Sequence, residues 1–134
     1  MNLSPEQKKK VQKIAEKYNL RLLALFGSRA KGNFSSKSDY DFAYLSKNIL
    51  SISEEANLAT DLAEIFKNCL IDLSSIRNSS PLLLRQITKE GEIFYEDMPG
   101  LFTEIYLYAL RIYRETLPLY RAEIKNIKSR LASL

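Results

Sequence analysis

The sequence contains no histidine and only one cysteine among its 134 residues. Without histidine the chain cannot form a Ser-His-Asp or Cys-His triad, an imidazole-ligated zinc site or a histidine general base. A single cysteine excludes a disulfide or a cysteine-based metal site within the chain, and we expect Cys69, in an apolar run, to be a buried small side chain. Any chemistry must therefore use carboxylates, hydroxyls, backbone groups, lysine or arginine, and such oxygen ligands suit Mg²⁺ or Mn²⁺.

The sequence also has no apolar run long enough to span a membrane, and residues 1–5 lack the apolar core of a signal peptide. We therefore expect a cytoplasmic protein without membrane contact. The net charge of +4 is small, and its basic clusters at 8–10 and 125–130 carry no interleaved aromatic residues. This pattern is typical of solvated helix surfaces, so nucleic acid is not an expected partner.

The composition, with 46% hydrophobic and 27% charged residues, is that of one globular domain with a helical appendage. The apolar periodicity and turn signals predict strands in close pairs and across helices, which favours an α+β fold: a small mixed β-sheet with helices packed on one face and a C-terminal helical extension. We expect strands at 20–26, 39–45, 70–76 and 92–95, helices after Ser4, Ser51 and Ser80, and helices beyond Pro99 that break or kink at Pro118.

A turn able to hold phosphate follows the first strand, in the stretch Gly27-Ser28-Arg29-Ala30-Lys31-Gly32. A helical turn that opens at Ser28 points its backbone N–H groups in one direction, which makes an anion site. Gly27 permits close approach of the backbone to a phosphate, and Ser28 adds a hydroxyl donor. Arg29 and Lys31 are candidate cations for the same phosphates, although a solvent-facing turn explains these two equally well.

Two aspartates follow this turn, at positions 39 and 41 of the segment Ser38-Asp39-Tyr40-Asp41. Two residues apart on a strand, the carboxylates of Asp39 and Asp41 project to one side, while Tyr40 and Phe42 project to the other. Two like charges this close repel, so a partly buried pair requires a cation. A pair of loop aspartates capping a turn is the alternative, and the alternation with aromatic residues argues against it.

A third carboxylate, Asp72, lies in the otherwise apolar stretch from Leu70 to Leu73. An unpaired carboxylate in a buried strand is costly. By itself Asp72 is explained equally well as a surface-facing strand residue. If its strand neighbours the one that carries Asp39 and Asp41, the three carboxylates converge and can bind divalent ions, which makes all three candidate catalytic and metal-binding residues.

Together, Gly27-Ser28, Ser38-Asp39-Tyr40-Asp41 and Asp72 resemble the GS…DxD…D signature of the polymerase-β nucleotidyltransferase superfamily. The short chain and its segment 91–96 are similar to the minimal (MNT) branch, and within it to the antitoxins of HEPN–MNT toxin–antitoxin modules. The resemblance covers about residues 8–97 by pattern and the tail by its helical character. It implies a minimal nucleotidyltransferase domain at 1–97 and a C-terminal helical extension at 98–134.

The resemblance also implies a reaction, in which ATP is the donor and two Mg²⁺ ions assist. Asp39 and Asp41 would bridge both ions, and Asp72 would bind the ion nearest the acceptor and help to deprotonate it. Gly27 and Ser28 would hold the β and γ phosphates. Antitoxins of this type transfer AMP to a tyrosine of the partner HEPN toxin with release of pyrophosphate, which silences the RNase activity of the toxin.

One departure from the family pattern is the aromatic run Phe42-Ala43-Tyr44, where aliphatic residues are usual; the carboxylates are intact, so we expect an active enzyme. A nucleotidyltransferase with a small-molecule or RNA acceptor is an alternative, disfavoured because no second domain or basic stripe is evident. Another is a non-catalytic antitoxin that binds through an apolar face of the C-terminal helix, unless that face covers the domain's own sheet. The face consists of Phe102, Ile105, Tyr106, Ala109, Ile112 and Tyr113.

Overall fold

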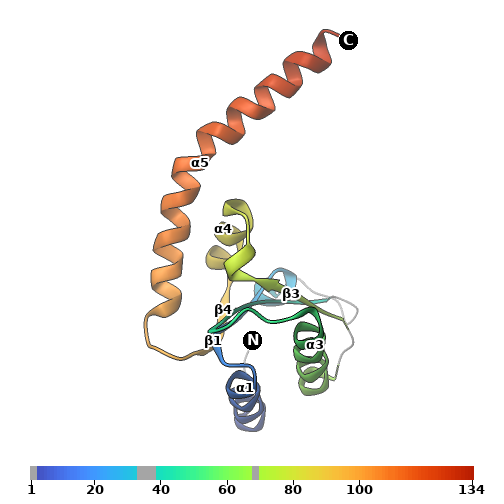
Figure 1. Ribbon diagram of the computed structural model, residues 1–134, viewed down its shortest axis with the longest axis vertical. Helices are drawn as coiled ribbons and strands as arrows, with labels where there is room; N and C mark the ends of the chain where they lie inside the picture. The colour runs from blue at the N-terminus through green and yellow to red at the C-terminus, as the bar shows by residue number, and fades with distance from the viewer. Residues whose placement is uncertain (1–2, 33–38, 68–69) are drawn as a thin grey trace.

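The computed structural model describes residues 3–32, 39–67 and 70–134 and shows one four-stranded sheet flanked by helices, from which a long C-terminal helix extends (Figure 1). The expected loop at 33–37, Ser38 and Cys69 lie outside these residues. The α+β class with a mixed sheet is confirmed. The elements are α1 (Pro5–Lys17), β1 (Leu20–Phe26), α2 (Ser28–Lys31), β2 (Tyr40–Ser46), α3 (Ile52–Phe66), β3 (Ile71–Ser75), a 3-10 turn (Ile76–Asn78), α4 (Pro81–Glu90), β4 (Glu92–Glu96) and α5 (Leu101–Ala132).

The starts of three helices follow from local sequence. Ser4 and Ser51 accept hydrogen bonds from the backbone N–H three residues later, and the side chains of Gln7 and Glu54 accept bonds from the backbone N–H of these serines. These capping boxes satisfy N–H groups that have no partner within the helix. Ser80 caps α4 in the simpler one-way form. All three helix starts that the sequence predicts are therefore confirmed.

The sheet has the strand order β3-β2-β1-β4, which places the first strand of the chain inside the sheet. β1 pairs antiparallel with both β2 and β4, and β2 pairs parallel with β3. A parallel pair requires a crossover, which α3 provides. β1 is buried along nearly its whole length, and this agrees with its mostly apolar sequence, in which Arg21 is the partly exposed exception.

Helices cover both faces of the sheet, so the expectation of helices on one face is wrong. α1 and α3 pack against one face, while α4 and the first part of α5 pack against the other (Figure 1). The physical reason lies in β1, whose neighbouring side chains Leu22 and Leu23 point to opposite faces and are both fully buried. In α3 the buried side chains are Leu58, Leu62 and Ile65.

The C-terminal helix α5 is continuous through Pro118 and changes direction about midway along its length (Figure 1). Proline has no N–H to donate to the preceding turn, which bends a helix. In its first part Leu101 and Ala109 are buried, and Phe102, Ile105 and Ile112 pack against the core beside α4. That part of the helix therefore covers the domain itself.

Gly91 ends α4 in an extended conformation (φ −67°, ψ 140°). A side chain is excluded at this position, because a Cβ would overlap the backbone carbonyl oxygen of Ile87 and lie 2.9 Å from the ring of Phe102. Gly91 thus allows α5 to pack closely. Within the described ranges, no helix combines the length and the apolarity needed to cross a bilayer.

Candidate active site

The pairing of β2 with β3 places Asp41 directly beside Asp72. Neighbouring strands lie about 4.8 Å apart, and residues paired in a parallel register point to the same face. Asp41 shares its face with Ala43, which packs in the core beneath α4 and α5, while Tyr40, Phe42 and Tyr44 belong to the core on the other face. The aromatic residues that depart from the family pattern therefore point away from the carboxylates.

The three carboxylates interact electrostatically. Burial raises the pKa of Asp41 above its ordinary value, and the negative charges of Asp72 and Asp39, with a hydrogen bond to Asp72, raise it further. Asp41 is half-buried, whereas Asp39, just before β2, and Asp72 are exposed. The arrangement brings together the three acidic residues that the sequence predicts, with Asp41 at the centre.

Gly27 closes the site on the side of β1. Its neighbour Phe26 pairs with Asp41, and a Cβ added at Gly27 would overlap the Oδ2 atom of Asp41. The backbone at Gly27 has φ +74°, a conformation that residues other than glycine rarely adopt. The turn backbone can therefore lie against the carboxylate only because this residue has no side chain.

The element after Gly27, α2, is a single helical turn with Ser28 at its first position. In this turn the backbone N–H of Lys31 donates a hydrogen bond of 3.2 Å to the carbonyl oxygen of Gly27. N–H groups of a first turn have no partner within the helix, so they can bind an anion. Gly27 thus lies against Asp41 and Ser28 follows it at the start of the turn, while phosphate binding by these two residues stays a prediction.

Arg29 and Lys31 are held by other parts of the protein. The guanidinium of Arg29 is buried and lies 4.3 Å above the ring of Tyr40, a cation–π contact. Lys31 Nζ lies 2.7 Å from Glu90 Oε1 at the end of α4. These contacts tie α2 to β2 and to α4. Binding of phosphate by Arg29 and Lys31 remains a prediction.

Sequence reasoning missed Glu90 as part of this region. Its side chain is largely buried, and its Oε2 atom has no hydrogen-bond partner in the described part of the chain. A buried carboxylate needs a cation, and Lys31 supplies one. No local pattern signals this pair, because the two residues lie far apart in the chain and on different helices.

The donor set fits magnesium. A half-buried carboxylate surrounded by two others is favoured only when a cation balances the charge. Within the described ranges, no three Asp, Glu, Cys or His side chains are placed so as to enclose an ion by themselves. Mg²⁺ does not require such a cage, since it is usually held by one or two carboxylates together with substrate phosphates. Asp39, Asp41 and Asp72 are therefore suited to a metal that binds with a nucleotide.

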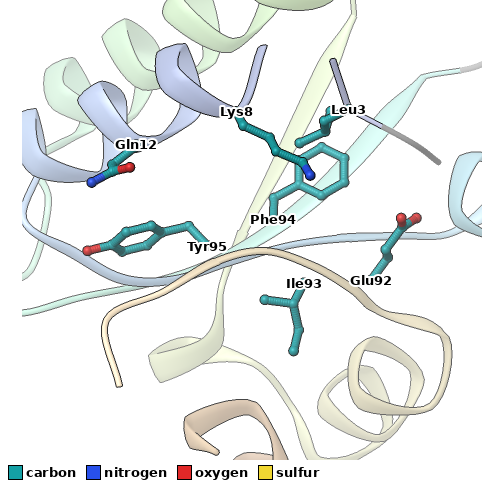
Figure 2. Close-up of a pocket in the computed structure, with 7 residues that line it drawn as sticks. All are labelled: Leu3, Lys8, Gln12, Glu92, Ile93, Phe94 and Tyr95. Carbon is teal, nitrogen blue, oxygen red and sulfur yellow. The ribbon is translucent and has the colours of Figure 1, made fainter. Parts of the chain in front are cut away.

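A cavity of about 510 Å³ lies elsewhere, between α1 and the edge strand β4 (Figure 2). In Figure 2 Lys8 and Leu3 lie near the ring of Phe94, and the side chain of Ile93 points to the other side of the strand. β1 separates this strand from the one that carries Asp41. The cavity is therefore not lined by the three carboxylates.

Comparison with known proteins agrees with this geometry. The family model described as "Polymerase beta, Nucleotidyltransferase" matches residues 9–99. The protein adenylyltransferase MntA of Aphanizomenon flos-aquae (strain 2012/KM1/D3) is 29% identical over 124 residues, which cover 82% of this chain and 79% of that protein. The residues that the family model matches include the turn and all three aspartates.

Solved structures share the nucleotidyltransferase fold. A chain in a toxin–antitoxin crystal structure with AMP-PNP is 24% identical, with a TM-score of 0.77, and the match covers 90% of this chain and 98% of that one. A chain in the complex of tri-AMPylated Shewanella oneidensis HEPN toxin with MNT antitoxin is 22% identical, with a TM-score of 0.72 and coverage of 92% and 97%. Spectinomycin adenyltransferase AAD(9) of Enterococcus faecialis is 17% identical, with a TM-score of 0.51 and coverage of 77% and 59%. The family model spans well over half of the sequence, and the chain belongs to the polymerase-β nucleotidyltransferase family.

Proposed function

We propose that this protein is an antitoxin that transfers AMP from ATP to a tyrosine hydroxyl of a cognate HEPN RNase toxin, releases pyrophosphate and so neutralises the toxin. The observation that carries the proposal is the pairing of β2 with its two neighbouring strands, which sets Asp41 beside Asp72 of β3 and against Gly27 at the end of β1. A nucleotidyl transfer needs carboxylates for metal ions and a turn for phosphates at one place.

In the proposed reaction Asp39 and Asp41 would hold two Mg²⁺ ions, and Asp72 would help to hold the metal that serves the acceptor. When bound, the ions neutralise negative charge that develops on the phosphate oxygens. Asp72 also assists removal of the proton from the acceptor hydroxyl. Gly27 and Ser28 bind the β and γ phosphates, which positions the α phosphorus for in-line attack. A bond forms between the acceptor oxygen and that phosphorus, and the bond to the leaving pyrophosphate breaks.

The choice of a protein acceptor is supported by the relatives. The A. flos-aquae relative is a protein adenylyltransferase, and the Shewanella complex holds a tri-AMPylated HEPN toxin with an MNT antitoxin. A small-molecule acceptor has less support, since spectinomycin adenyltransferase extends well beyond the part that matches this chain. The reaction consumes ATP and acts on an RNase, so we place it in the cytoplasm. We assign the transfer chemistry to residues 1–97 and treat residues 98–134 as the helical extension.

The test is incubation with ATP, Mg²⁺ and the HEPN protein encoded by the neighbouring gene, followed by measurement of intact mass. We expect the HEPN protein to gain adenylate mass. The Asp39→Asn/Asp41→Asn variant should transfer at least about 10³-fold more slowly, because the ligands of both ions lose their charge. A matched control is Asp61→Asn. This change removes a carboxylate on α3 that pairs with Lys17 of α1 and is not one of the three site carboxylates.

Two results would contradict the proposal in different ways. Undiminished labelling by the Asp39→Asn/Asp41→Asn variant would refute the metal assignment. A tight complex that neutralises the RNase without any gain of mass would show an antitoxin that acts by binding alone.

A further inference from the structure

The second half of α5 extends away from the domain (Figure 1) and carries a row of apolar side chains that are partly or largely exposed. The apolar side chains recur at alternating intervals of three and four residues, the spacing of a coiled-coil seam. Three of them are more than half exposed, Ile124 at 53%, Ile127 at 51% and Leu131 at 62%. We call this set the distal stripe; it consists of Leu117, Tyr120, Ile124, Ile127 and Leu131.

The distal stripe continues one edge of the domain-covering face, where Tyr106 and Tyr113 lie against Arg85, but not the main line of that face. That face follows the line of Ile105 and Ile112, which pack beside α4. Seven residues further on the same line reaches Leu119, which is 69% exposed, and then the polar residues Asn126 and Ser133. The domain-facing line thus becomes polar once the helix leaves the domain, whereas the distal stripe stays apolar over 15 residues, about 22 Å of helix.

Charge along one edge of the stripe indicates what covers it. Arg114, Arg121 and Lys128 recur every seven residues. Arg121 and Lys128 directly follow the stripe residues Tyr120 and Ile127, and Arg114 follows Tyr113 on the same line. All three side chains are exposed. Positions that flank a coiled-coil seam form ion pairs with the partner helix and select it. A partner helix with acidic residues along its matching edge fits this row of three cations.

A second copy of this chain fits less well. In an antiparallel pair the row of Arg114, Arg121 and Lys128 would face its own copy, and like charges repel. Only about two heptads are free, because Tyr106 and Tyr113 on the same line lie against Arg85 of α4, and self-assembling coiled coils usually need three or more. The charge pattern therefore favours a different protein.

We propose that the distal stripe is the docking surface for the protein acceptor, which presents an amphipathic helix with an apolar seam and an acidic edge. This inference rests on the proposed function, since it assumes that the enzyme acts on a protein. A helix laid along an exposed apolar seam buries area on both partners, and the row of cations sets its orientation. The site that transfers AMP and the surface that holds the acceptor are then separate parts of the chain.

The experiment compares two matched substitutions in the full chain, Ile124→Ser on the distal stripe and Leu119→Ser on the other side of the same helix. The probe is the HEPN protein of the neighbouring gene, with Kd measured by calorimetry. We expect Ile124→Ser to weaken binding about 10-fold and Ile124→Ser/Ile127→Ser about 100-fold, while Leu119→Ser changes Kd less than about 2-fold. Arg121→Glu/Lys128→Glu should weaken binding about 10-fold and make it less dependent on salt.

AMP transfer measured in parallel separates this inference from the proposed function. We expect Ile124→Ser/Ile127→Ser to raise KM for the acceptor and to leave kcat within about 2-fold. If the unaltered chain labels the acceptor and this variant labels it with an unchanged KM, the docking surface is wrong while the function stands. If the unaltered chain binds the acceptor through the distal stripe without labelling it, the function is wrong while the docking surface stands. A dimer in sedimentation that Ile124→Ser/Ile127→Ser abolishes and Leu119→Ser preserves would overturn the partner in favour of a second copy.

Discussion

The two faces of β2 carry opposite kinds of side chain, although they alternate along seven residues of one strand. On one face Tyr40, Phe42 and Tyr44 enter a closed aromatic core beneath α1 and α3. On the other face Asp41 and the small side chain of Ala43 lie beside Asp72 and Gly27. The first face supplies packing, whereas the second places like charges together, which is unfavourable without a bound cation.

The difference shows how the strand can hold such a site. The rings of Phe42, Phe66 and Phe94 have centroids 5.4 to 5.8 Å apart, a distance at which aromatic pairs attract. Phe42 has no exposed surface. This packing fixes the position of β2, so the carboxylate on its other face is held in place by contacts that it does not make itself. Neighbouring residues of β2 thus have different roles: Phe42 contributes to stability, and Asp41 belongs to the candidate site.

The largest effect on stability should come from Phe42→Ala, which leaves a cavity among these rings. We expect a loss of about 3–5 kcal/mol in the free energy of unfolding, measured with urea in metal-free buffer. The matched change on the other face, Asp41→Asn, should leave stability unchanged or raise it, because it removes repulsion from Asp39 and Asp72. Equal losses of unfolding free energy for the two variants would mean that both faces of β2 contribute to stability in the same way.

The next effect concerns Gly27, where the carboxylate face meets the turn. Gly27→Ala should destabilise the protein by about 2–4 kcal/mol, through backbone strain and overlap with Asp41, and should reduce AMP transfer at least 10-fold. Gly32→Ala is the control, since Gly32 has φ +80° and open space around it, so this change adds strain alone.

A double-mutant cycle sharpens the same comparison. In an Asp41→Ala background the overlapping Oδ2 atom is gone, so Gly27→Ala should have a smaller effect on the unfolding free energy, close to that of Gly32→Ala. An effect as large as in the unaltered chain would show that the carboxylate does not press against the turn.

Much of this arrangement can be predicted from the sequence because it depends on local rules. The alternation of aspartate and aromatic residues from 39 to 44 predicts the two faces of β2, and the capping residues Ser4 and Ser51 predict two helix starts. Asp72 was expected beside Asp41 only on the condition that their strands neighbour each other. The parallel pairing meets that condition.

The remaining features depend on contacts between distant parts of the chain. The ion pair of Lys31 with Glu90 and the position of Arg29 over Tyr40 follow from the placement of α2 against α4 and β2, which no local pattern specifies. The covering of both sheet faces was missed because apolar periodicity shows that a helix has a buried face, not which side of the sheet it covers. Likewise, Pro118 signals a bend, while only the structure shows that the helix continues beyond it.

The smallest effect concerns a polar group at the margin of the aromatic face, the hydroxyl of Tyr44, which donates a hydrogen bond of 2.7 Å to Glu55 Oε1 on α3. Burial raises the pKa of Tyr44, and the hydrogen bond and the charge of Glu55 raise it further. Tyr44→Phe should lower the free energy of unfolding by about 1 kcal/mol at neutral pH.

Above about pH 10 an unfolded tyrosine loses its proton while the folded one keeps it. The unaltered chain therefore loses stability as pH rises, and the Phe variant lacks that contribution. The difference between the two chains should therefore shrink between pH 9 and pH 11 in urea titrations, and Glu55→Gln, which keeps an acceptor but removes the charge, should make the pH dependence weaker. A difference that stays constant over this range would mean that Glu55 does not hold the hydroxyl of Tyr44 in a hydrogen bond.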